Sequence, residues 1–324
     1  MKKREADKMT LEQYMRELWL MDKQYGREEE LYPLINMLLR DGANTENLSI
    51  RDVHKGKSAK NDKSRKYIDG FGSFPDLAIF GENFPEGQEP KNVEEGENTI
   101  LKNIYGCVEA KCIGSDLIDS KLLKCLDHNT MKIGPRKENP KEEEKDYYVQ
   151  IYTGKAENNY YVQINTEKGI SLMNDQGINN AGQLLGELLW YGKVLYTNGL
   201  IWKYYKLSEL EELEKNQKTI NDIRREWIIA DRNKGDTSPD GKNPHENWNK
   251  ERKTWIFEQC KKPLKIISKN IGDLTKIYNK IKDETSIPAF NEFDLQDYQE
   301  WKNFKTNLAT IDWTEDIFLC NRSQ

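Results

Sequence analysis

Two acidic residues and a lysine occupy positions from which they could act together. Asp76 follows Pro75 at the start of a short apolar run, and Glu109 and Lys111 lie two residues apart in the next such run. Successive side chains of a β-strand alternate between its faces, so Glu109 and Lys111 would share one face. If the two runs pair as strands, Asp76 and Glu109 converge. Carboxylates placed in this way suit a hard divalent cation such as Mg²⁺.

Such a site would favour the hydrolysis of a phosphate ester. We expect Asp76, Glu109 and the main-chain carbonyl of Ala110 to hold the ion, which would polarise the phosphate and lower the pKa of an attacking water. Lys111 would orient or help to deprotonate that water and stabilise charge on the phosphate. An acid-x-Lys triplet often arises by chance in a chain with 32% charged residues, and the alternative is a solvent-facing strand end. The position of both motifs on apolar runs favours the site.

Two amphipathic helices are predicted before these motifs. Thr10 and Gln13 fit a capping box that opens the first helix. The second covers residues 28–40 and ends at Asp41-Gly42. Its apolar stripe consists of Leu31, Leu34, Ile35, Leu38 and Leu39.

Short apolar or alternating runs predict strands further along the chain. They cover residues 75–80, 104–111, 147–153, 160–166, 194–197 and 201–207. A helix is predicted over residues 180–190, a tight turn at Asn198-Gly199 and a charged loop over residues 132–145. Beyond residue 208 the periodicity is mainly helical. We therefore predict a mixed α/β domain over residues 1–207 and a mainly helical domain of unknown role over residues 208–324.

The strands at 147–153 and 160–166 repeat a Tyr-Tyr-Val-Gln-Ile pattern and predict a hairpin. Its aromatic and glutamine side chains could contact nucleic-acid bases. The same alternation is typical of any half-buried hairpin, so a structural or dimer-forming flap is the favoured interpretation.

Composition excludes several classes of protein. The five cysteines form no CxxC pair and the three histidines are scattered, which argues against a zinc site. A net charge of −5 argues against a protein that coats nucleic acid non-specifically. No apolar run reaches the roughly 18 residues of a membrane span, and no signal peptide is recognisable. We expect a cytoplasmic protein.

The order of these elements resembles the PD-(D/E)xK nucleases, whose fold is restriction-endonuclease-like. In that family a helix with a glutamate precedes the PD strand, the ExK strand, a helix and a further strand. Gln183 at the start of a helix and the Thr197-Asn198-Gly199 segment followed by Trp202 are similar to the nuclease domain of type I restriction subunits and their stand-alone relatives. The resemblance covers residues 28–207 and implies a mixed sheet flanked by helices.

The resemblance also implies roles for individual residues. Asp76 and Glu109 would be the metal ligands and Lys111 the catalytic lysine. The helix glutamate would be Glu29 or Glu30, and Glu29 is preferred because the apolar positions that follow it then match those of the family.

The match is less complete at the later helix. Gln183 would correspond to the family's helix glutamine. Glu187 stands where that family often has a tyrosine, and Tyr191 comes one turn later.

The implied activity is that of a Mg²⁺-dependent DNA endonuclease, with Mn²⁺ as a substitute ion, acting in restriction or another defence against foreign DNA. It would bind DNA and work as a homodimer or with a partner subunit of a restriction system. Two alternatives remain open: a nucleic-acid-binding or assembly protein that keeps this fold without turnover, and a protein-interaction module.

Overall fold

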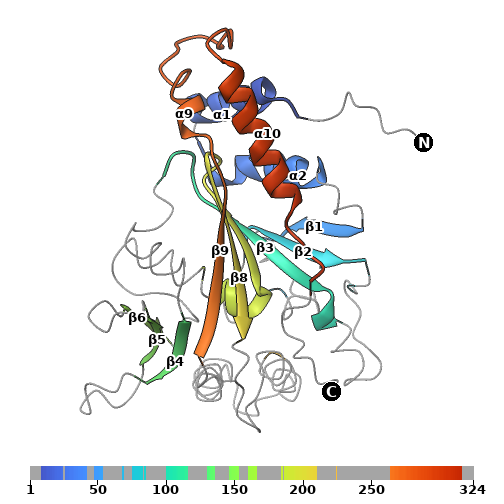
Figure 1. Ribbon diagram of the computed structural model, residues 1–324, viewed down its shortest axis with the longest axis vertical. Helices are drawn as coiled ribbons and strands as arrows, with labels where there is room; N and C mark the ends of the chain where they lie inside the picture. Colours follow the sequence, from blue (N-terminus) through green and yellow to red (C-terminus); the bar gives the residue numbers. More distant parts are fainter. Residues whose placement is uncertain are drawn as a thin grey trace, which may run out of the picture.

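One sheet contains all nine strands that the structure describes. The computed structural model describes residues 9–24, 26–41, 47–53, 68, 75–82, 84, 100–115, 130–135, 146–152, 160–165, 184, 186–209, 224 and 263–315. Within them the strand order is β1-β2-β3-β7-β8-β9-β4-β5-β6 (Figure 1). The strands are β1 (Leu48–Asp52), β2 (Leu77–Gly81), β3 (Ile104–Ala110), β4 (Thr130–Pro135), β5 (Asp146–Tyr152), β6 (Tyr160–Asn165), β7 (Lys193–Thr197), β8 (Ile201–Glu209) and β9 (Pro263–Asp273).

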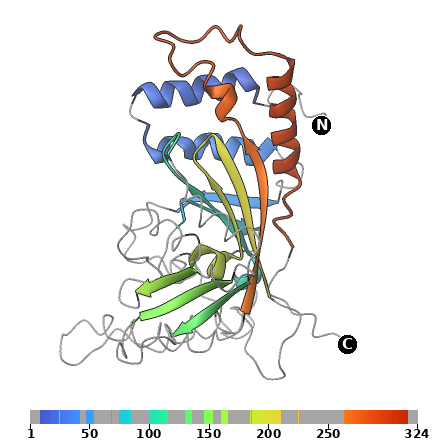
Figure 2. The same ribbon diagram turned by 60° about the vertical axis from the view of Figure 1, so that its left-hand side comes forward.

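The sheet is mixed. β3 and β7 pair in parallel, and the other neighbouring strands pair antiparallel. β4, β5 and β6 join the rest only where the first residues of β4 and β9 meet, and Figure 2 shows them diverging from the other strands. The expected α/β class with a mixed sheet is therefore confirmed.

Both predicted N-terminal helices are present. They are α1 (Leu11–Gln24) and α2 (Leu31–Asp41), the second preceded by a short 3-10 turn, η2 (Glu28–Glu30). The predicted capping box opens α1, because the Thr10 amide donates to Oε1 of Gln13 at 2.9 Å and the Gln13 amide donates to Oγ1 of Thr10 at 3.2 Å. Two later helices, α9 (Thr275–Tyr278) and α10 (Leu295–Ala309), follow β9.

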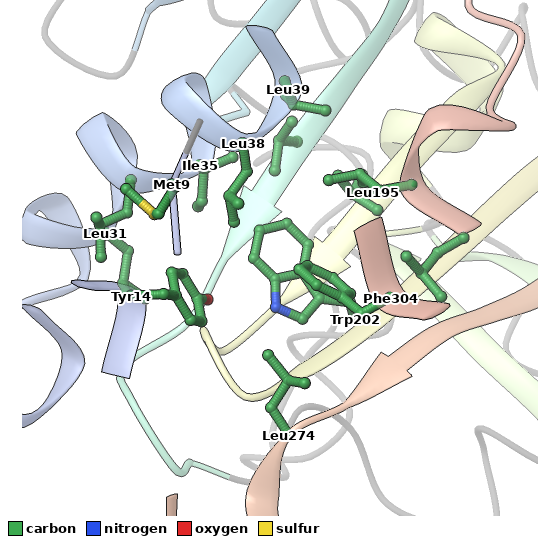
Figure 3. Close-up of a cluster of buried hydrophobic side chains, with 14 of the residues drawn as sticks. Met9, Tyr14, Leu31, Ile35, Leu38, Leu39, Leu195, Trp202, Leu274 and Phe304 are labelled. Atoms are coloured by element: carbon green, nitrogen blue, oxygen red, sulfur yellow. The ribbon is translucent and has the colours of Figure 1, made fainter. Parts of the chain in front are cut away.

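One hydrophobic core joins the first and last described segments of the chain. Apolar side chains of α1, α2 and α10 pack against alternate residues of the sheet, as Figure 3 shows around Trp202. The Trp202 ring lies 5.3 Å from that of Phe304, which belongs to α10. The hydroxyl of Tyr14 in α1 donates to the carbonyl of Gly199 at 2.5 Å, so the predicted turn between β7 and β8 is held under the helices.

Several predictions about the later part of the chain are wrong. Residues 263–273, predicted to be helical, form β9, which pairs with β8 along its whole length. The division into two domains near Leu207 stays a prediction, although β8 continues past this residue to Glu209. Ile271 of β9 is buried in the core that α1 and α2 share. Charged and polar residues on the solvent side of β9 obscured the alternating pattern that would have predicted a strand. Residues 130–135, partly assigned to a loop, form β4, and β1 was not predicted.

The predicted tyrosine hairpin exists as β5 and β6, which pair antiparallel with Val149 opposite Val162.

Within the described ranges, no helix has both the length and the apolar character needed to cross a membrane.

Candidate metal centre

The register of two strands places Asp76 opposite Glu109. β2 and β3 are antiparallel, with Leu77 across from Val108. Continuing this register by one residue sets Asp76 across from Glu109, and directly opposed residues of antiparallel strands have Cβ atoms about 4.5–5.5 Å apart. Both side chains are buried, with exposed fractions of 6% for Asp76 and 1% for Glu109. The structure thus brings together the two acids that the motif spacing singled out.

Both carboxylate oxygens of Asp76 accept hydrogen bonds. The main-chain amide of Ala110 donates to Oδ2 at 2.7 Å, and the hydroxyl of Tyr32 donates to Oδ1. The main chain is fixed as well, because the Val53 amide donates to the carbonyl of Asp76 at 3.1 Å. Asp76 therefore has a defined orientation at the start of β2.

A third carboxylate comes from the segment before α2. Glu28, in the first position of η2, offers one oxygen that lies within 4.8 Å of one oxygen each of Asp76 and Glu109. Glu29, which was preferred from the sequence, is exposed, and Glu30 is not in this cluster. The backbone of η2 directs the side chain of Glu28, and not that of Glu29, towards the sheet. Glu28, and not the Glu29 preferred from the sequence, is therefore the glutamate of this segment that joins the acidic cluster, while the role of a helix glutamate stays a prediction.

Lys111 lies beside the acidic cluster. Its ammonium donates a hydrogen bond to Oε1 of Glu109, and its Nζ lies 4.0 Å from Oε2 of Glu28. Tyr196 in β7 lies opposite Glu109 of β3. The centroid of its ring is 6.0 Å from Nζ of Lys111. The predicted lysine therefore contacts two of the three carboxylates.

Burial and neighbouring charges shift the pKa values of Glu109 and Lys111. Burial, followed by the carboxylates of Glu187 and Asp76, raises the pKa of Glu109 well above its usual value, although Lys111 opposes this. Burial lowers the pKa of the Lys111 ammonium, but Glu109 and Glu28 outweigh it, so the pKa of Lys111 is raised overall. Lys111 is consequently a cation at neutral pH.

The residues present fit a divalent cation. Glu28, Asp76 and Glu109 supply only oxygen atoms, which are the donors that Mg²⁺, Mn²⁺ and Ca²⁺ prefer. Among the described residues, the buried Oε2 of Glu109 has no hydrogen-bond partner. A buried carboxylate oxygen without a partner is costly, and a bound ion would supply the missing positive charge.

Residues predicted at the later helix have different outcomes. Gln183 lies outside the described residues. Glu187, which departs from the family pattern, is buried and close enough to Glu109 to raise its pKa. The Tyr191 hydroxyl donates to the carbonyl of Ile68 at 2.6 Å, a structural contact.

Three residues at the site went unrecognised in the sequence. Glu28 was one of three adjacent glutamates, Tyr32 lay in the predicted amphipathic helix over residues 28–40, and Glu187 was noted only as a departure from a pattern. A four-residue spacing between Glu28 and Tyr32, which puts both on one side of a helix, was the available signal.

Comparisons of the chain with models of known protein families, with curated proteins and with solved structures give no match in any of the three. The chemistry of the site follows from its own residues.

Proposed function

We propose that this chain is a Mg²⁺-dependent endodeoxyribonuclease of the PD-(D/E)xK type, acting in restriction or another defence against foreign DNA. The observation that carries the proposal is the convergence of Glu28, Asp76 and Glu109 on one point with Lys111 hydrogen-bonded beside them. The antiparallel pairing of β2 with β3 and the parallel pairing of β3 with β7 support the proposal.

The three carboxylates would hold the ion. Asp76 is pre-oriented by hydrogen bonds from Ala110 and Tyr32. Glu109 presents Oε2, which has no partner within the described part of the chain, and Glu28 adds a carboxylate whose side chain is 30% accessible. When bound, a divalent ion supplies Lewis-acid polarisation of a phosphate and lowers the pKa of a coordinated water. Mn²⁺ would replace Mg²⁺ because both take oxygen ligands.

Lys111 would act as a cation. Its raised pKa keeps the ammonium protonated at neutral pH, so it would donate hydrogen bonds to the phosphate and to the attacking water instead of removing a proton. Glu109 and the ring of Tyr196 hold the ammonium in place before substrate arrives. Such a preformed donor stabilises the charge that develops in the transition state.

Cleavage of DNA by matched variants tests the proposal. Supercoiled plasmid and phage DNA, modified and unmodified, would be incubated with Mg²⁺, Mn²⁺ or a chelator. Lys111→Ala should lower the rate by about 10²–10³, the usual cost of losing one transition-state donor, and should keep Ca²⁺ binding. Asp76→Ala should abolish both DNA cleavage and Ca²⁺ binding. Lys269→Ala is the control, because this exposed lysine lies outside the acidic cluster and its ammonium donates to the exposed hydroxyl of Thr310 at 2.7 Å.

Two results would count against the proposal. Cleavage that persists undiminished in both Asp76→Ala and Lys111→Ala would remove this site from the reaction. Absence of cleavage by the wild type, with DNA and Ca²⁺ still bound, would indicate a nucleic-acid-binding protein without turnover.

A further inference from the structure

Tyr32 connects the N-terminal helices to the acidic cluster. Its side chain is 4% exposed and its ring belongs to the hydrophobic core, yet its hydroxyl reaches Oδ1 of Asp76. The residue lies four positions after Glu28, on the same side of one helical turn. One turn therefore delivers both a carboxylate to the cluster and a donor to another of its carboxylates.

Donors from different elements reach the two oxygens of Asp76. The amide of Ala110 belongs to β3 and approaches Oδ2 at 2.7 Å, whereas the phenol of Tyr32 belongs to α2 and approaches Oδ1. Donors on both oxygens hold the carboxylate plane in one orientation. A carboxylate oxygen offers two acceptor sites, so these hydrogen bonds are compatible with a bound ion.

The core holds the phenol in place. Tyr32 is buried, and its ring belongs to the same hydrophobic core as Leu31 and Ile35. The hydroxyl is thereby kept next to Oδ1 of Asp76.

We propose that Tyr32 is a positioning residue, whose hydroxyl sets the orientation of Asp76 and thereby the cation affinity of the acidic cluster. The inference rests on the proposed cation site. Hydrogen bonds to a ligating side chain typically contribute a factor of about 10–100 to metal affinity. Removing the hydroxyl of Tyr32 should weaken cation binding by about 10–100-fold. The chemical step should stay almost intact once the cation is bound.

Calorimetric titration with Ca²⁺ tests the proposal directly. Tyr32→Phe removes one oxygen atom, and its dissociation constant for Ca²⁺ should rise by about 10–100-fold. Tyr278→Phe is a matched control: it also deletes a tyrosine hydroxyl that donates to an aspartate, Asp22, at 2.8 Å, outside the acidic cluster. Its Ca²⁺ affinity should equal that of the wild type.

The Mg²⁺ dependence of DNA cleavage gives a second test, because a purely structural role of Tyr32 would not change it. The Mg²⁺ concentration for half-maximal cleavage by Tyr32→Phe should rise in parallel with its Ca²⁺ dissociation constant, and kcat at saturating Mg²⁺ should stay within a few-fold of the wild type. A fall in kcat with unchanged Mg²⁺ dependence would overturn the positioning role.

The outcomes separate this inference from the proposed function. Ca²⁺ binding by the wild type and equally by Tyr32→Phe would overturn the role of Tyr32 and leave the site standing. No Ca²⁺ binding by the wild type would remove the site itself. If Tyr32→Phe is too unstable for calorimetry, the gain in its melting temperature at a fixed Ca²⁺ concentration should be smaller than that of the wild type, because weaker binding stabilises less; an equal gain would contradict the proposal.

Discussion

Oε2 of Glu28, in η2, lies 4.0 Å from Nζ of Lys111, which directly follows β3 and is far away in the sequence. The contact brings the N-terminus of α2 to the end of β3. It also identifies which of three consecutive glutamates belongs to the acidic cluster, and this assignment can be tested.

Glu28→Gln should weaken Ca²⁺ binding, whereas Glu29→Gln should not. Both changes remove one negative charge from adjacent positions, but only Glu28 lies within 4.8 Å of the other carboxylates. A ligand should matter at least as much as the outer partners of a metal site, so we expect a loss of roughly 10–100-fold for Glu28→Gln. Calorimetric titration measures it. A larger loss for Glu29→Gln would restore the assignment made from the sequence.

Divalent ions should stabilise the fold. Ca²⁺ at about 100 times its dissociation constant should add about 2.7 kcal/mol to the free energy of unfolding, because the ion binds the folded chain and not the unfolded one. The double variant Asp76→Asn, Glu109→Gln should show no gain. Thermal melting with and without Ca²⁺ is the measurement, and equal gains in the two proteins would place the ion elsewhere.

The ion-free protein should lose stability as the pH rises through the range in which Glu109 titrates. Its pKa in the folded chain is raised above 4.5, so the folded state keeps a proton that the unfolded state releases. The free energy of unfolding then falls as the pH rises from about 4.5 to the raised pKa. Urea unfolding in a chelator at several pH values should show a steeper fall for the wild type than for Glu109→Gln. Parallel stability curves for the two proteins would contradict the raised pKa of Glu109.

The same shift predicts that cation binding releases protons, because the ligand must be ionised to bind. Ca²⁺ titrations in buffers with different ionisation enthalpies should give different apparent heats for the wild type. This difference should shrink in Glu109→Gln.

Gly106→Ala should destabilise the protein by about 1–3 kcal/mol, the usual cost of overpacking. A Cβ there would lie 2.6 Å from the ring of Trp313 and 3.0 Å from the carbonyl of Lys193. The Lys193 ammonium donates to the carbonyl of Trp313 at 2.7 Å, so the segment after α10 has little freedom to move aside. Urea unfolding measures the loss. Adding Trp313→Leu should cost less than the sum of the two single changes, and strict additivity would contradict the packing.

The sequence by itself determined Asp76, Glu109 and Lys111 as a group. A strand repeats every two residues, so the spacing of Glu109 and Lys111 put them on one side whatever the rest of the fold. Pro75 and the apolar run after it marked the start of β2, and pairing of two such runs was enough to bring Asp76 near Glu109. Local periodicity also predicted α1, α2 and most of the strands before residue 210.

The tertiary structure alone decided the rest of the site and the end of the fold. The choice of Glu28 over Glu29 depends on how η2 and α2 dock on the sheet, because neighbouring residues of a 3-10 turn point about 120° apart and both positions hold a glutamate. The contact between Tyr32 and Asp76 depends on the same docking. β9 gained its extended form from hydrogen bonds to β8, a partner more than fifty residues away, and no local pattern within Pro263–Asp273 could report that pairing.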